Sequence, residues 1–169
     1  IGGFLLDLGA KHPEWNVLGV EIRQHFVNGV LKQAGLRGLN NVQAIVANIN
    51  RDLDELLEDQ SVAFVSVNFP DPWFKKRHHK RRVIQSSFLD VMARKLVPGG
   101  EFHLMTDFTP IGEDALEIFE GRPEFENLEG PGKFAQNSTT GIMSEREVTH
   151  MGRGDLISRL HYIHVPVSA

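Results

Sequence analysis

The sequence contains no cysteine among its 169 residues. This absence excludes disulfides, thiolate zinc sites and cysteine nucleophiles. No apolar run approaches the roughly 20 residues that a membrane-spanning helix needs, and the N-terminus lacks the basic and apolar regions of a signal peptide. We therefore expect a cytoplasmic protein that does not act on a membrane.

Extremes of composition are absent as well. The chain is 41% hydrophobic and 24% charged, which is typical of soluble globular proteins. A chain of this length buries roughly two-thirds of its unfolded surface, so it needs neither a metal nor a disulfide to fold. We find no internal repeat and expect a single domain over residues 1–169.

Basic residues are scarce outside one segment. Residues 75–82 read KKRHHKRR and hold six of the 18 Lys and Arg residues, whereas the other 161 residues carry 12 basic and 22 acidic side chains. A local concentration of this kind on an acidic chain favours contact with a polyanion. The alternative is a solvated run of charge without a partner.

Short apolar runs alternate with amphipathic stretches along the chain. Strands are predicted at residues 16–22, 42–47, 61–67, 101–106 and 156–165, and helices at 23–34, 53–57, 83–96 and 111–119. Residues 121–140 are predicted to form a long loop. The alternation predicts an α/β fold, a mostly parallel sheet with helices on both faces. Because no strand precedes the first helix, we expect the first strand of the sheet to be missing from the sequence.

Ligands of open α/β sheets bind beyond the carboxyl ends of the strands. Gly2 and Gly3 precede a helix, so a cofactor could approach the backbone there. Glu21 ends the strand at 16–22, where a carboxylate can accept both hydroxyls of a ribose. Asn48 follows the next strand, where an amide can face an adenine. These residues favour a nucleoside cofactor, and a helix cap or a turn is the alternative for each polar one.

The strand at 61–67 runs into the segment NFPDPWF, residues 68–74. Two prolines flank Asp71 and restrict the backbone on both sides. The segment therefore displays a carboxylate and the indole of Trp73 rigidly, directly ahead of the basic segment. Chemistry on a nucleic-acid base needs this combination, since phosphate contacts give affinity and carboxylates can read base edges.

The run NFPDPWFKKRHHKRR at residues 68–82 closely resembles the signature of bacterial tRNA (guanine-N(7)-)-methyltransferases. The resemblance extends to residues 4–22, 98–107 and 142–154. It implies a Rossmann-like class I methyltransferase fold and an enzyme that uses S-adenosylmethionine (SAM). The implied reaction methylates nitrogen 7 of a guanine in the variable loop of tRNA.

The resemblance also implies roles for individual residues. The residues expected to bind SAM are Gly2, Gly3, Glu21, Asn48 and Asp71, with Asp71 also catalytic at the junction with the substrate. Those expected to bind the substrate are Lys75, Asp107, Ser144 and Glu147. The charge run itself, apart from the resemblance, supplies the cations expected to contact tRNA phosphates: Lys76, Arg77, Lys80, Arg81 and Arg82.

Nitrogen 7 of guanine has a free lone pair, so no base is needed before methyl transfer. We therefore expect Asp71 to act by positioning and electrostatics. No metal is expected, because the adjacent His78 and His79 lie among six cations that would repel a divalent ion. The oligomeric state stays open between monomer and homodimer.

Three other functions remain as alternatives. Residues 68–70 resemble the N-P-P-Y/F loop of amino-group methyltransferases, which would move the target to an exocyclic nitrogen. The short glycine segment at the start lacks the E-x-G-x-G-x-G pattern of the family, which leaves a non-catalytic RNA-binding protein on the same fold. A nicotinamide-dependent dehydrogenase would need G-x-G-x-x-G, which the sequence lacks.

Overall fold

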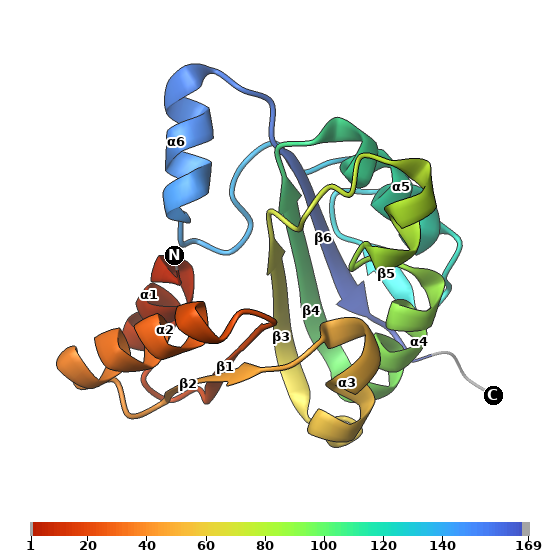
Figure 1. Ribbon diagram of the computed structural model, residues 1–169. Coiled ribbons are helices and arrows are strands. Elements are labelled where there is room, and N and C mark those ends of the chain that lie inside the picture. The colour runs from red at the N-terminus through yellow and green to blue at the C-terminus, as the bar shows by residue number, and fades with distance from the viewer. Residues whose placement is uncertain (1, 167–169) are drawn as a thin grey trace.

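The structure, a computed structural model, describes residues 2–166, apart from the side chains of Lys76 and His79. Its six strands form two sheets (Figure 1). The strands are β1 (Val17–Glu21), β2 (Val42–Val46), β3 (Val62–Asn68), β4 (Leu96–Thr106), β5 (Phe125–Asn127) and β6 (Ser158–His164).

The first sheet is the parallel pair β1–β2, and the second has the strand order β3-β4-β6-β5. Within the second sheet β3 and β4 are parallel, whereas β6 runs antiparallel to both β4 and β5. The sequence predicts one sheet. The described chain forms two, because no described strand is hydrogen-bonded to both β1 and β3.

The described residues form six α-helices and one 3₁₀ helix, of which all but the first connect strands. They are α1 (Gly3–Lys11), α2 (Gln24–Leu36), α3 (Ile49–Leu56), η1 (Lys76–Arg81), α4 (Ser86–Lys95), α5 (Thr109–Glu120) and α6 (Glu145–Arg153). None of the described helices has the length and apolar character that crossing a membrane requires.

Each sheet has its own hydrophobic core. Phe102 and Leu104 of β4 point toward α3, α4 and α5, where they meet Leu89, Met92 and Phe119. The three helices lie together on one side of the four-stranded sheet in Figure 1. A second core joins α1 and α2 to β1 and β2, and the ring of Phe64 from β3 packs against it.

The predicted strands and helices are confirmed with shifts at their ends, except around the segment Pro98-Gly99-Gly100. The sequence predicts that this segment ends a helix and that a strand begins at residue 101. Instead β4 begins at Leu96 and passes through the segment. A register shift between β3 and β4 near Val62 absorbs the irregular backbone.

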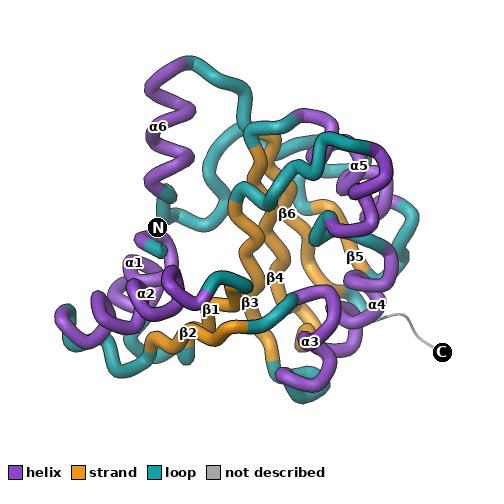
Figure 2. The backbone as a smooth tube through the Cα atoms, in the orientation of Figure 1, coloured by secondary structure: helices purple, strands orange, loops and turns teal. Residues whose placement is uncertain are grey.

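Three elements are not predicted from the sequence: the helix η1, the strand β5 and the helix α6. The strand β5 lies inside the predicted loop at 121–140 and pairs with β6. The helix α6 precedes β6, and its first turn lies beside the start of α1 (Figure 1). Figure 2 shows that the loops after β3 and β4 leave the sheet at the edge that faces α6. Asp71 and Asp107 lie on these two loops, just after β3 and β4.

Candidate functional site

The segment after β3 holds Asp71 in an unusual backbone conformation. Phe69 and Trp73 both have left-handed φ values, 51° and 44°. A bulky residue adopts this region rarely and at a cost, and such strain concentrates at functional sites. Pro70 and Pro72 fix the backbone φ angle on either side of Asp71. The loop therefore presents the exposed Asp71 rigidly just after the carboxyl end of β3.

Arg82 connects this loop to the body of the protein. Its side chain is buried, its Nε donates to the carbonyl oxygen of Pro72 at 3.1 Å, and its guanidinium forms an ion pair with Asp114 of α5. The carbonyl oxygen of Arg82 accepts a hydrogen bond from Asn50 Nδ2 at 2.8 Å. Arg82, predicted from the charge run to contact phosphate, is therefore directed into the protein.

The remaining cations of the basic segment are displayed. Residues 76–81 form the helix η1, and Lys75, Arg77, Lys80 and Arg81 are exposed. The side chain of Lys76 lies outside the described residues. The Arg81 guanidinium lies over the indole of Trp73, 5.0 Å from the ring centre. The exposed cations thus form a surface beside the Asp71 loop that suits phosphate groups.

The glycine pair at the start of α1 approaches other chain segments closely. Gly2 has φ +88°, and a Cβ at that position would lie 2.3 Å from a methyl group of Val30. A Cβ at Gly3 would lie 3.2 Å from a carboxylate oxygen of Glu145 in α6. Only glycine fits at position 2. Because glycine has no side chain, a ligand could approach the backbone there directly.

Glu21 stands at the carboxyl end of β1, as predicted, and Arg23 holds its carboxylate. The Arg23 backbone N–H and Nε donate to Glu21 Oε1 at 3.0 and 3.1 Å. Partial burial opposes ionisation, but the bonds from Arg23 prevail and lower the pKa of Glu21. The negative charge of Asp71 also raises the pKa of Arg23. Arg23 thus holds the Glu21 carboxylate in place through its backbone and its guanidinium.

Asn48 caps the helix α3. Its Oδ1 accepts from the backbone N–H of Asn50 at 3.0 Å, and its own N–H donates to Asp52 at 2.8 Å. In the sequence, a turn residue is the alternative to an adenine contact here. The cap uses only the oxygen of the amide, and the side chain is exposed at the end of β2.

These features fit the nucleoside end of SAM. An ionised carboxylate, an exposed amide and a glycine that leaves its backbone uncovered occupy α1 and the carboxyl ends of β1 and β2. A carboxylate can accept the two ribose hydroxyls, and an amide can pair with a purine edge. The ribose would share the Glu21 carboxylate with Arg23, which occupies Oε1.

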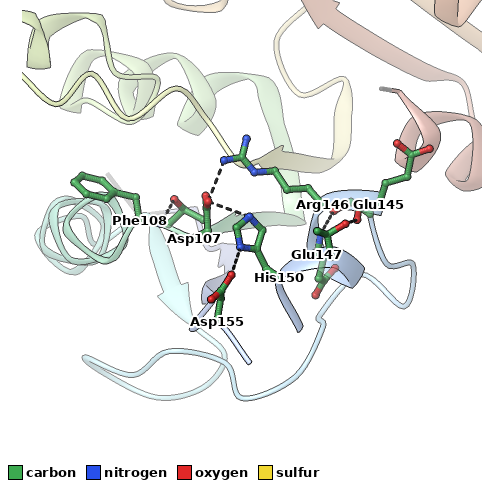
Figure 3. A network of polar contacts seen from close by, with 10 residues as sticks. Asp107, Phe108, Glu145, Arg146, Glu147, His150 and Asp155 are labelled. Atoms are coloured by element: carbon green, nitrogen blue, oxygen red, sulfur yellow. Dashed lines mark hydrogen bonds and ion pairs between the residues drawn. The ribbon is translucent and has the colours of Figure 1, made fainter. Parts of the chain in front are cut away.

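Asp107 follows β4 and lies at the centre of a polar network (Figure 3). Its Oδ2 accepts from the Arg146 guanidinium at 2.9 Å and lies 3.1 Å from His150 Nε2. The other ring nitrogen of His150 lies 2.8 Å from Asp155. The ring of Phe69 stacks on His150, with 5.8 Å between ring centres. The network fastens α6 to the loops that follow β3 and β4.

Ser144 and Glu147, predicted to contact substrate, are both buried. Ser144 Oγ caps α6 by accepting from the backbone N–H of Glu147 at 3.1 Å. Glu147 Oε1 accepts two hydrogen bonds from Arg159 of β6, at 2.9 and 2.8 Å. Glu147 Oε2 is buried without a hydrogen-bond partner among the described residues. The ion pair between Glu147 and Arg159 therefore attaches α6 to the strand β6.

Arg23 and His150 are not predicted from the sequence, and Arg146 is predicted only as part of the stretch at 144–147, without its role toward Asp107. Arg23 lies two positions after Glu21, within reach of its carboxylate. Arg146 and His150 are four positions apart and so share one helix face, from which both reach Asp107. The pattern Ser-x-x-Glu at residues 144–147 is a known helix start, and it could have revealed both the helix and this face.

The chain is similar to known methyltransferases in sequence and in fold. The family described as "Putative methyltransferase" matches residues 1–159. The tRNA (guanine-N(7)-)-methyltransferase of Alkalilimnicola ehrlichii is 40% identical over 163 residues, which are 95% of this chain and 68% of that protein. The enzyme of the same name from Halorhodospira halophila is 38% identical over 94% of this chain and 71% of its own length.

The enzyme of that name from a Synechococcus strain is 40% identical over 86% of this chain and 61% of its own length. The match to the enzyme of that name from Shewanella amazonensis covers 53% of that protein. The chain thus spans only part of these relatives.

Solved structures resemble the fold. The aminoglycoside resistance methyltransferase NpmB1 aligns with 97% of this chain and 82% of its own, with a TM-score of 0.62 and 19% identity. The antibiotic-resistance methyltransferase Kmr aligns with 99% and 84%, with a TM-score of 0.64 and 16% identity. The Rossmann-like α/β methyltransferase fold predicted from the sequence is therefore confirmed, and by its sequence the chain belongs to the tRNA (guanine-N(7)-)-methyltransferase family.

Proposed function

We propose that residues 1–169 act as one domain that binds SAM and transfers its methyl group to nitrogen 7 of a guanine in tRNA. One observation carries this proposal. The strained loop at 69–73 displays the exposed Asp71 at the carboxyl end of β3, directly ahead of the exposed cations of η1, and Glu21 ends the strand β1. A methyl donor and a polyanionic acceptor would meet at this carboxylate.

Binding of the acceptor is divided between two sets of residues. The exposed cations Lys75, Arg77, Lys80 and Arg81 hold phosphates, which supply most of the affinity for a nucleic acid. Asp107 accepts guanine N–H groups, which adenine does not present in the same pattern. Ser144 and Glu147 contribute indirectly, because they anchor the helix from which Arg146 and His150 orient Asp107.

SAM supplies a methyl group on a positively charged sulfur, and the residues of this chain align the acceptor with it. Glu21 holds the ribose, and Asn48 faces the adenine with its amide nitrogen. Asp71 stabilises the positive charge that develops on the purine ring, and its rigid loop keeps the carboxylate in place throughout. Guanine nitrogen 7 carries no proton, so Asp71 need not act as a base.

Replacing Asp71 by Asn tests the proposal, because the amide keeps the shape and removes the charge. We expect single-turnover methylation of tRNA to slow by ~10²–10³, with tRNA affinity nearly unchanged since phosphates dominate it. The rate should not rise steeply between pH 6 and 9 in either protein. Asp90→Asn, at an exposed aspartate of α4, is the matched control. A rate within threefold of the parent would reduce Asp71 to a turn residue.

The same assay separates the alternatives. A tenfold rise in rate per pH unit that disappears in Asp71→Asn would indicate deprotonation of an exocyclic amino group. Mass spectrometry of the modified nucleoside identifies the methylated atom directly. Absence of SAM binding to the folded protein, with tRNA binding retained, would indicate a non-catalytic RNA-binding protein.

A further inference from the structure

Three metal-ligand side chains meet on the face of the four-stranded sheet opposite α3, α4 and α5. Alternation along β4 points Phe102 and Leu104 into the helical core, so Glu101 and His103 point to the other face. His161 of β6 lies directly across from His103 in the antiparallel register. Adjacent strands thus bring one carboxylate and two imidazoles together.

Their donor atoms converge on one point. Glu101 Oε2 lies 3.0 Å from His103 Nε2 and 2.9 Å from His161 Nε2, and all three atoms lie within 4.8 Å of one another. The imidazole rings stack with 4.2 Å between their centres. Ligands bound to Zn²⁺ at 2.0–2.1 Å in a tetrahedron are separated by roughly 3.3 Å. Small rotations of the side chains would bring the three donors to that spacing.

The surroundings orient the buried imidazole. His103 is 1% exposed, and its second ring nitrogen, Nδ1, lies 2.7 Å from Thr139 Oγ1. A metal-bound histidine commonly makes such a bond with its other nitrogen, which fixes the tautomer and ring orientation. The ring of Phe64 packs against His103, with 4.7 Å between centres. The side chain of Glu101 is 45% exposed, so solvent and ions can reach the cluster.

We propose that Glu101, His103 and His161 bind a divalent transition-metal ion of the Zn²⁺ class, with water completing the coordination. Two imidazoles and one carboxylate favour Zn²⁺ over the oxygen-seeking Mg²⁺ and Ca²⁺. The bound ion would clamp the middle of β4 to β6, four residues before Asp107. The expectation of no metal rested on His78 and His79 alone, which lie among cations. The pairing of His103 with His161 emerges only when β4 and β6 are aligned.

Calorimetric titration of the full chain with Zn²⁺ tests the site, together with the visible absorption of bound Co²⁺. We expect one ion to bind per chain, and we expect bound Co²⁺ to show the visible absorption bands of an ion with low-symmetry coordination. His161→Gln and Glu101→Gln should each weaken Zn²⁺ binding by at least about 10-fold, and Thr139→Val, which removes the orienting hydroxyl, by about 10–100-fold. Circular dichroism verifies that each variant is folded.

His12→Gln is the matched control, because His12 faces a single carboxylate, Glu14, at 3.3 Å. Its Zn²⁺ affinity should equal that of the parent. Failure of the parent to bind Zn²⁺ or Co²⁺, or equal affinity in all the variants, would overturn the proposal. The first result would leave Glu101 as a hydrogen-bond acceptor for two imidazoles. Neither measurement uses SAM or tRNA, so the outcome is independent of the proposed function.

Discussion

Arg82 donates a hydrogen bond from Nε to the carbonyl oxygen of Pro72, ten residues earlier in the chain. This bond fixes one end of the loop that carries Asp71, and the ion pair of Arg82 with Asp114 fixes the loop to α5. Arg82 ends the basic segment, yet its environment differs from that of the exposed Arg81. The two neighbouring arginines should therefore respond differently to substitution.

Arg82→Lys keeps the charge but loses the Nε–H and the forked geometry of the guanidinium. We expect the Asp71 loop to shift and single-turnover methylation to slow by about 10²-fold, the effect of a displacement near 1 Å at a reacting centre. Affinity for tRNA and its salt dependence should stay at the parental values. If Arg82→Lys methylates tRNA as fast as the parent, the Asp71 loop keeps its conformation without the hydrogen bond from Arg82.

The exposed cations should show the converse pattern. The double variant Arg77→Gln/Lys80→Gln should bind tRNA more weakly, and the slope of log affinity against log salt should flatten by roughly 0.7–0.9 for each phosphate group that is no longer neutralised. At saturating tRNA the methylation rate should change little. Fluorescence anisotropy over a series of salt concentrations measures the slope. An unchanged slope would make the segment a solvated surface.

Glu21→Ala should weaken SAM binding by about 1.5–3 kcal/mol, the range for hydrogen bonds to a charged group. Loss of the carboxylate also removes the acceptor of the hydrogen bonds that Arg23 donates. Isothermal calorimetry with SAM measures the effect, with Glu58→Ala, at an exposed residue after α3, as the control. Equal SAM affinity in Glu21→Ala and the parent would remove Glu21 from the cofactor site.

The buried pair Glu147–Arg159 should matter mainly for stability. Glu147→Gln leaves the buried Arg159 guanidinium uncompensated, which typically costs about 3–5 kcal/mol of unfolding free energy. Urea denaturation measures this loss, and Arg153→Gln at the exposed end of α6 should leave it unchanged. If Glu147→Gln instead keeps parental stability but loses tRNA methylation, Glu147 contacts the substrate directly.

Acid should weaken the contact between α3 and α4. Hydrogen bonds from Arg94 and then Lys95 lower the pKa of Asp54 to about 2, from an ordinary value of 3.8. The carboxylate therefore stabilises the fold fully above pH 3.8, and this contribution is lost as the pH falls through 2. Urea midpoints should differ between the parent and Asp54→Asn near neutrality and converge as the pH approaches the lowered pKa. A difference that is constant with pH would contradict the assignment.

The positions of the site residues along the chain could be predicted because strand ends follow from hydrophobic pattern. Glu21 and Asp71 lie at or just after the carboxyl ends of β1 and β3, where the sequence put them. Burial could not be predicted in the same way. Arg82 and Glu147 look like solvent-facing charges until their partners Asp114 and Arg159, 32 and 12 residues away, are brought beside them.

Local pattern failed where pairing or capping decided the structure. The helix α6 exposes Val148 and Met151 and buries only Glu147 of its nine residues, so it has no apolar stripe to detect. Its start depends on the Ser144 cap. The strand β5 has three residues and exists because β6 offers it an edge. In β4, Pro98 and Gly99 indicate a break, but pairing with β3 resumes within a few residues.

A cofactor that contacts both Glu21 and Asp71 would bridge two hydrophobic cores. Glu21 ends β1, which packs in one core, whereas Asp71 follows β3 of the other sheet. Phe64 of β3 already packs its ring against the core of β1 and β2. A molecule that binds only when both carboxylates are in place would add its binding energy to the stability of the whole fold.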